Sequence, residues 1–185
     1  MQKSNGLQPL LMARPSRPSP PRSAKAETRT FFVTSRTFAG KPLFQTERMA
    51  TLFIDVLRAY TLSGNFKVRE FVVMPNHVHL LITVADDMSI EKAVQMIKGG
   101  FSYRAKKKLE YSGEIWQRGF SDVQIRDEDS YRAHRSYIYN NPVKAGLVGS
   151  AEEYVYGSLY FRRSKAQGLK PVAQTAMVGT TEVMP

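Results

Sequence analysis

Two of the three histidines in the chain, His77 and His79, stand two residues apart in the sequence His-Val-His. Side chains on a β-strand alternate between its two faces, and Val78 and Leu80 are expected on the core face. Both imidazoles would therefore project from the opposite, non-core face, close enough to share a metal ion. A half-exposed strand can also carry histidines as ordinary polar residues, and an isolated His-x-His leaves that alternative open. Because two of the only three histidines in the chain lie in this motif, a metal site is favoured.

A second group of polar residues stands near the end of a predicted helix. Tyr137 and Asn141 are four residues apart and therefore lie on one helix face. A phenol can act as a nucleophile, and an amide oxygen can bind a metal. On a helical wheel Tyr137 lies about 40° from Asn141, whereas Tyr139 lies about 160° from it, so only Tyr137 can share a site with Asn141. The alternative is ordinary packing, with Asn-Pro simply ending the helix.

The elements that carry these residues follow from the spacing of apolar side chains. Alternation and β-branched residues predict four strands, over 28–37, 67–74, 77–84 and 121–126. The second and third strands form a hairpin around the turn Pro75-Asn76. Three- and four-residue spacing predicts helices over 46–62 and 89–109, and a third over 130–140 that Asn141-Pro142 closes. The order matches an α+β, ferredoxin-like (split βαβ) fold: a four-stranded antiparallel sheet with an added C-terminal helix that carries Tyr137.

Length and composition limit the class of protein. The chain has 185 residues, of which 42% are hydrophobic, enough for one domain with a real core. It lacks the ~18 consecutive apolar residues of a membrane span, so no membrane association is expected. The absence of cysteine excludes disulfides, iron–sulfur clusters and cysteine nucleophiles. Residues 1–26 are rich in proline and serine and are predicted to be a disordered basic tail; the domain is expected over 27–162, followed by a disordered tail over 163–185.

The charge balance favours a polyanionic partner. There are 27 Lys and Arg against 16 Asp and Glu, a net charge of +11, and nucleic acid is the first candidate for such a chain. More than half of the excess lies in the two tails, so charge alone does not settle function. Basic residues on a helix often only face solvent. Those on the long helix and near the predicted site are nevertheless candidate DNA contacts: Lys98, Arg104, Lys106, Lys107, Arg118, Arg126 and Arg135.

Together the motifs resemble a known family. The chain contains MPNHVHLLI at 74–82, IWQRGF at 115–120 and YIYNNPVKAGLV at 137–148. This combination resembles the single-tyrosine HUH transposases of the IS200-like type and, within them, the REP-associated tyrosine transposases. The resemblance covers residues 28–161, which is nearly all of the predicted domain.

The resemblance implies a metal-dependent single-stranded DNA endonuclease and strand transferase. In that family the residues that match His77 and His79 bind a divalent metal, magnesium or manganese, with help from the residue that matches Asn141. Tyr137 matches the catalytic tyrosine, which forms a 5′-phosphotyrosine intermediate. Hairpin or palindromic repeat DNA is the implied substrate, and the expected location is the cytoplasm, at the nucleoid. Strand rejoining needs no nucleotide cofactor, and the chain has no phosphate-binding G-x-x-x-x-G-K-[ST] loop.

Two other functions stay open at this level. One is a non-catalytic nucleic-acid-binding module on a ferredoxin-like sheet, and the other is a metal-binding structural domain. The family also contains monomers and dimers, which use the tyrosine in cis or in trans; we expect a monomer.

Overall fold

The computed structural model describes residues 28–168, so the predicted tail 1–26 and most of the predicted tail 163–185 lie outside the described residues. Four strands form one antiparallel sheet in the order β2-β3-β1-β4. They are β1 (Thr28–Arg36), β2 (Lys67–Met74), β3 (His77–Ala85) and β4 (Ser121–Ile125). This strand order confirms the predicted α+β, ferredoxin-like sheet.

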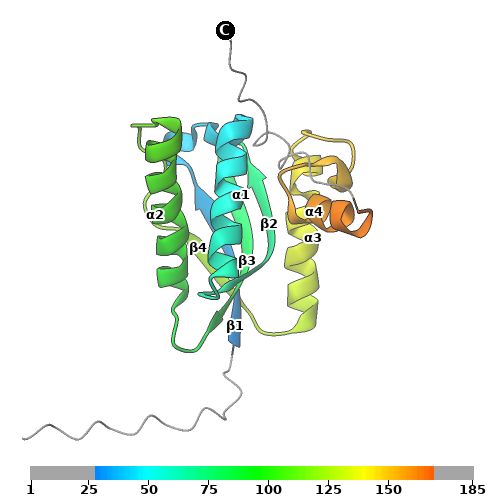
Figure 1. Cartoon of the computed structure of the whole chain (residues 1–185). Helices are drawn as coiled ribbons and strands as arrows, with labels where there is room; N and C mark the ends of the chain where they lie inside the picture. Colours follow the sequence, from blue (N-terminus) through cyan, green and yellow to red (C-terminus); the bar gives the residue numbers. More distant parts are fainter. Residues whose placement is uncertain (1–27, 169–185) are drawn as a thin grey trace, which may run out of the picture.

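Two long helices cover one face of the sheet (Figure 1). They are α1 (Glu47–Leu62) and α2 (Ile90–Leu109), and their apolar stripes bury side chains against Val33, Val78 and Leu80. The Ser89 hydroxyl caps α2 by accepting a hydrogen bond from the Lys92 amide at 3.2 Å. Three short 3₁₀ helices complete the connections: Phe38–Gly40, Leu43–Gln45 and Ala151–Glu153.

The opposite face of the sheet is covered by α3 (Glu128–Lys144), which carries Tyr137. Ile138 of this helix packs against Val72, Met74 and Leu81 in a second apolar cluster. The alternation of strand residues predicted a core on one face of the sheet, with the histidines on the other face. The structure shows instead that both faces of the sheet are packed.

Helix α3 does not end where its sequence suggests. The predicted helix stopped at residue 140, but the helix continues through Pro142 to Lys144. A proline in a helix removes one backbone donor. Here it stands in the last turn and its ring is buried. The backbone amides of Ala145 and Leu147 then close the end of the helix on the carbonyls of Asn141 and Pro142. Asn141 is therefore part of the helix, one turn after Tyr137.

A fourth helix, α4 (Ser158–Ala166), was not predicted. It crosses the expected domain boundary at residue 162 and therefore moves the end of the folded part to a later residue. The segment before it runs beside the edge strand β2, where the Val73 amide donates to the Tyr156 carbonyl at 3.0 Å. In Figure 1, α3 and α4 lie together on the far side of β2 from α1. None of the helices within 28–168 has the length and apolar character needed to cross a membrane.

Candidate active site

His77 and His79 lie next to each other on the α3 face of β3, with ring centroids 4.8 Å apart. Thr34 is the partner of His79 across the β1–β3 ladder, and its hydroxyl shares a hydrogen bond of 2.8 Å with His79 Nδ1. The Nδ1 atom of His77 hydrogen-bonds to Asn76 Oδ1 at 2.7 Å. Both rings are thus oriented through Nδ1, which leaves their Nε2 atoms for another partner.

The burial of the two histidines differs, which corrects the expectation that both would stand on a non-core face. His77 is half-buried, whereas His79 is only 5% exposed because α3 covers it. Its Nε2 atom is buried and has no hydrogen-bond partner among the described residues. An unpaired buried polar atom is unfavourable, and it therefore marks a position where a ligand would supply the missing partner.

The electrostatic surroundings keep both imidazoles neutral near pH 7. Burial, followed by the nearby charges of His77 and Arg36, lowers the pKa of His79 to about 3. Burial and the charge of Arg36 also lower the pKa of His77, while the side chain of Asn141, close enough to hydrogen-bond, acts in the opposite direction. A neutral imidazole is the form that binds metal ions.

Tyr137 lies directly beside the histidine pair. Its ring meets that of His79 edge to face, with centroids 5.1 Å apart, and Phe32 packs against both rings. The side chain is 41% exposed, and its hydroxyl makes no hydrogen bond within residues 28–168. The Lys144 ammonium lies 5.7 Å from the ring centroid. The structure therefore brings Tyr137 and Asn141 to the two histidines, and it leaves Tyr137 exposed.

Tyr139 points the other way, as the helical wheel predicted. Its hydroxyl donates a 2.9 Å hydrogen bond to Glu70 Oε2 on β2. Burial and the charge of Glu70 raise the pKa of Tyr139 to about 12. This hydroxyl is held as a donor and is turned away from the histidines.

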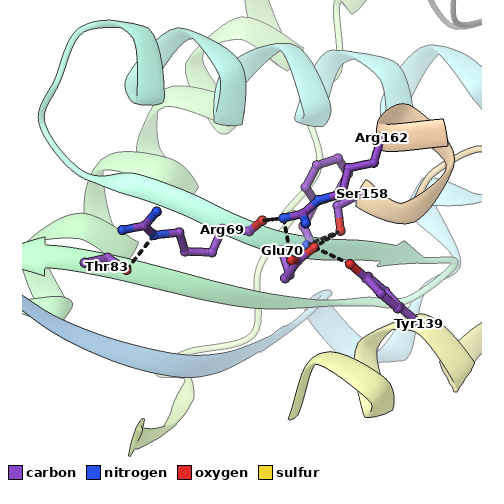
Figure 2. Close-up of polar contacts among 7 residues, drawn as sticks. Arg69, Glu70, Thr83, Tyr139, Ser158 and Arg162 are labelled. Carbon is purple, nitrogen blue, oxygen red and sulfur yellow. Dashed lines mark hydrogen bonds and ion pairs between the residues drawn. The ribbon is translucent and has the colours of Figure 1, made fainter. Parts of the chain in front are cut away.

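Glu70 is the buried centre of a polar cluster that fixes α3 to the sheet (Figure 2). The side chain is fully buried, and the Ser158 hydroxyl donates to the same Oε2 atom at 2.8 Å. The Arg162 guanidinium pairs with the other oxygen and also donates to the Arg69 carbonyl at 3.0 Å. The cluster joins β2, α3 and α4, so it sets the rotation of the helix that presents Tyr137.

Sequence reasoning missed this cluster, although a signal existed. Glu70 alternates with the buried residues Val72 and Met74 on one face of its strand. A carboxylate in such a position requires partners from elsewhere in the chain. The sequence does not say which residues they are.

The candidate DNA contacts fall in different places. Lys98 donates to the carbonyls of Gln117 and Gly119, at 2.9 Å each, so it fixes a loop. Arg118 stands in that loop and lines a cavity beside Thr34. Arg135 lies over the Tyr131 ring on α3, and Arg126 follows β4. The remaining three lie on α2, which packs on the face opposite to the histidines: Arg104, Lys106 and Lys107.

Comparison with known proteins gives consistent results. The family model described as "Transposase IS200 like" matches residues 32–141. A REP-associated tyrosine transposase of Escherichia coli (strain K12) is 33% identical over 108 residues, which cover 58% of this chain and 61% of that protein. A Haemophilus influenzae protein is 31% identical over 106 residues, or 51% of this chain and 60% of its own length. The chain thus matches about three fifths of the length of these curated relatives.

The fold is also found in a solved structure. A REP-associated tyrosine transposase bound to a REP hairpin superposes with a TM-score of 0.63 and 24% identity, covering 94% of this chain and 95% of that one. At this identity the similarity shows a shared fold. The family match extends from Phe32 in β1 to Asn141 in α3, and so spans the strand pair, the histidines and the tyrosine helix. The chain belongs to the IS200-like transposase family.

Proposed function

We propose that the chain is a transposase that cleaves and rejoins single-stranded DNA through Tyr137, with hairpin DNA as the substrate. The observation that carries this proposal is the exposed phenol of Tyr137 beside a neutral histidine pair. One atom of this pair, the buried His79 Nε2, has no hydrogen-bond partner in the described part of the chain. The hairpin is inferred from the solved relative with the same fold, which is bound to a REP hairpin. A DNA-cleaving enzyme works where the DNA is, so we place the chain in the cytoplasm, at the nucleoid.

The cleavage step is a transesterification. The Tyr137 hydroxyl loses its proton, and its oxygen forms a bond to the scissile phosphorus. The bond from phosphorus to the 3′ oxygen breaks, and that oxygen takes up a proton. The products are a 5′-phosphotyrosine and a free 3′-hydroxyl. A 3′-hydroxyl can then attack the phosphotyrosine and release the phenol, so rejoining consumes no nucleotide.

The donor set at the site fits a divalent metal such as magnesium or manganese. His77, His79 and Asn141 would hold it, and Thr34 and Asn76 already orient the two imidazoles through Nδ1. No group of three His, Cys, Asp or Glu side chains within 28–168 offers an alternative. When bound, the metal would polarise the scissile phosphate and offset the charge that develops on its oxygens.

The tyrosine would act in cis. Tyr137 and the histidines of the same chain meet directly, and the Glu70 cluster fixes α3 to the sheet of that chain. A complete site within one chain is the arrangement that a monomer requires. We therefore propose a monomeric enzyme.

The test uses the full chain with single-stranded DNA that ends in a hairpin, in the presence of manganese. We expect a protein–DNA adduct that survives denaturation, and its loss when the metal is chelated. Tyr137→Phe should bind the same DNA and give no adduct. If the unchanged chain binds the DNA but forms no adduct, it is a binding module instead. If it neither binds the DNA nor forms an adduct, it is a structural metal-binding domain.

A further inference from the structure

A cavity of about 280 Å³ opens beside the histidine pair, between β1 and the loop that precedes β4. Two of its lining residues, Thr34 and Arg36, are the strand partners of His79 and His77 across the β1–β3 ladder. The hydroxyl of Thr34 also contacts His79 directly. The cavity therefore lies next to the site where the scissile phosphate would lie.

The outer wall of the cavity is fixed in place. The Lys98 ammonium holds the carbonyls of Gln117 and Gly119, and the Gln117 amide donates to the Arg36 carbonyl at 3.0 Å. The Trp116 indole in turn donates to the Lys98 carbonyl at 3.2 Å. Gly119 has a φ of +71°, a conformation that favours glycine. A wall held in this way is preorganised to bind a ligand.

The chemistry of the lining suits an unpaired nucleotide. Arg36 and Arg118 are exposed, and neither guanidinium makes an ion pair or a side-chain hydrogen bond within residues 28–168. The planar guanidinium fork matches the oxygens of a phosphate and can bind them through two parallel hydrogen bonds. Phe120 is half-buried, packs against the core and lines the cavity, which Gln117 also lines. Aromatic rings stack on unpaired bases, and amides can hydrogen-bond to base edges.

We propose that this cavity binds one unpaired nucleotide of the DNA strand, next to the phosphate that Tyr137 attacks. Phe120 stacks on the base, Gln117 contacts its edge, and Arg36 and Arg118 hold its phosphate. The cavity thereby sets which phosphate reaches Tyr137. This inference rests on the proposed function, because it assumes that the strand lies across the histidine pair.

The experiment is an abasic scan. Wild-type protein first maps the cleavage position on hairpin-tailed single-stranded DNA. Binding is then measured by fluorescence anisotropy in the Tyr137→Phe background, where the DNA stays intact, with each nucleotide near that position replaced in turn by an abasic residue. One replacement next to the cleavage position should weaken binding about 10-fold, because it removes the base that stacks on the protein.

Variants of the cavity provide the decisive comparison. In Phe120→Leu the penalty for the abasic residue should fall to about twofold, because the base and the ring that stacks on it are coupled. In Gln117→Ala the penalty should fall by a smaller factor, because the stacking remains and only the contact to the base edge is lost. Phe120→Leu keeps an apolar side chain against the core, and exposed Gln117 tests the cavity without a packing change. Arg118→Ala should weaken binding to every DNA alike. Lys92→Ala, which removes one exposed charge from α2, is the matched control and should change little.

Two failures can be told apart. If wild-type protein forms no adduct, the proposed function is wrong; the binding scan, centred on the hairpin junction, then still tests the cavity. If an adduct forms but no single abasic position matters, or if the penalty is the same with and without the cavity substitutions, the cavity does not bind a nucleotide.

Discussion

Tyr137 and Tyr139 should give opposite phenotypes when each is replaced by phenylalanine. Each substitution removes one hydroxyl from the same helix, two residues apart. Tyr137 is exposed and its hydroxyl has no hydrogen bond within residues 28–168, whereas the Tyr139 hydroxyl donates to the fully buried Glu70. We expect Tyr137→Phe to lose the DNA adduct and keep its stability, and Tyr139→Phe to keep the adduct and lose stability.

The size of the stability change follows from the partner of Tyr139. A hydrogen bond to a charged group contributes about 1.5–3 kcal/mol to the free energy of unfolding. For a chain of this length, a loss of 1 kcal/mol lowers Tm by about 2–4 °C. Tyr139→Phe should therefore lower Tm by about 3–12 °C. The exposed change Tyr137→Phe should stay within about 0.5 kcal/mol of wild type.

Two measurements on the same preparations check this prediction. Thermal unfolding followed by circular dichroism gives Tm, and denaturing gel electrophoresis after incubation with hairpin DNA and manganese gives the adduct. Ser158→Ala is the matched control, because its hydroxyl donates to the same Glu70 oxygen. It should lower Tm and retain the adduct, and its effect should not add to that of Tyr139→Phe, since the two share an acceptor.

Three results would refute the reasoning. An adduct formed by Tyr137→Phe, or an adduct peptide that contains modified Tyr139, would show that the helix face is misassigned. Equal Tm values for the two phenylalanine variants would show that the Glu70 cluster does not hold α3. A folded Tyr139→Phe protein without any adduct would mean that this hydroxyl has a chemical role.

Other perturbations separate the site from the scaffold. His77→Ala and His79→Ala should both abolish the adduct. Only His79→Ala should also lower the free energy of unfolding, by about 1–3 kcal/mol in a denaturant titration, because His79 is buried beneath α3. A variant that still forms the adduct would contradict the assignment of these histidines to the active site. The contribution of Tyr139 to stability should be constant below pH 10 and should fall as the pH rises from about 10 toward 12, because its pKa is raised in the folded state from 10.0 to about 12. Tyr139→Phe should show a smaller loss of stability in alkaline melts, and an unchanged profile would argue against the assignment. Deleting residues 1–26 removes five positive charges. The deletion should reduce the slope of log affinity against log salt concentration by up to about 3.5 and leave the cleavage position unchanged. Cleavage at another position would show that the tail contributes specificity.

Sequence alone was sufficient for the local features of the fold. Alternation along β2 and β3, the Pro75-Asn76 turn and the apolar stripes of α1 and α2 are properties of neighbouring residues, and they gave these elements nearly correct ends. The shared strand face of His77 and His79 and the one-turn spacing of Tyr137 and Asn141 are local in the same sense. The motifs then indicated the family, which the family match shows.

Tertiary structure decided everything that depends on contacts between distant residues. Only the docking of α3 on the second face of the sheet turns Tyr137 toward the histidines and buries His79. That docking also allows Pro142 to remain inside a helix that the sequence predicted to end at residue 140. Glu70 finds its partners Tyr139 and Ser158 at positions 69 and 88 residues further along the chain. Local propensity does not encode such pairings, because burial, not neighbouring sequence, makes them favourable.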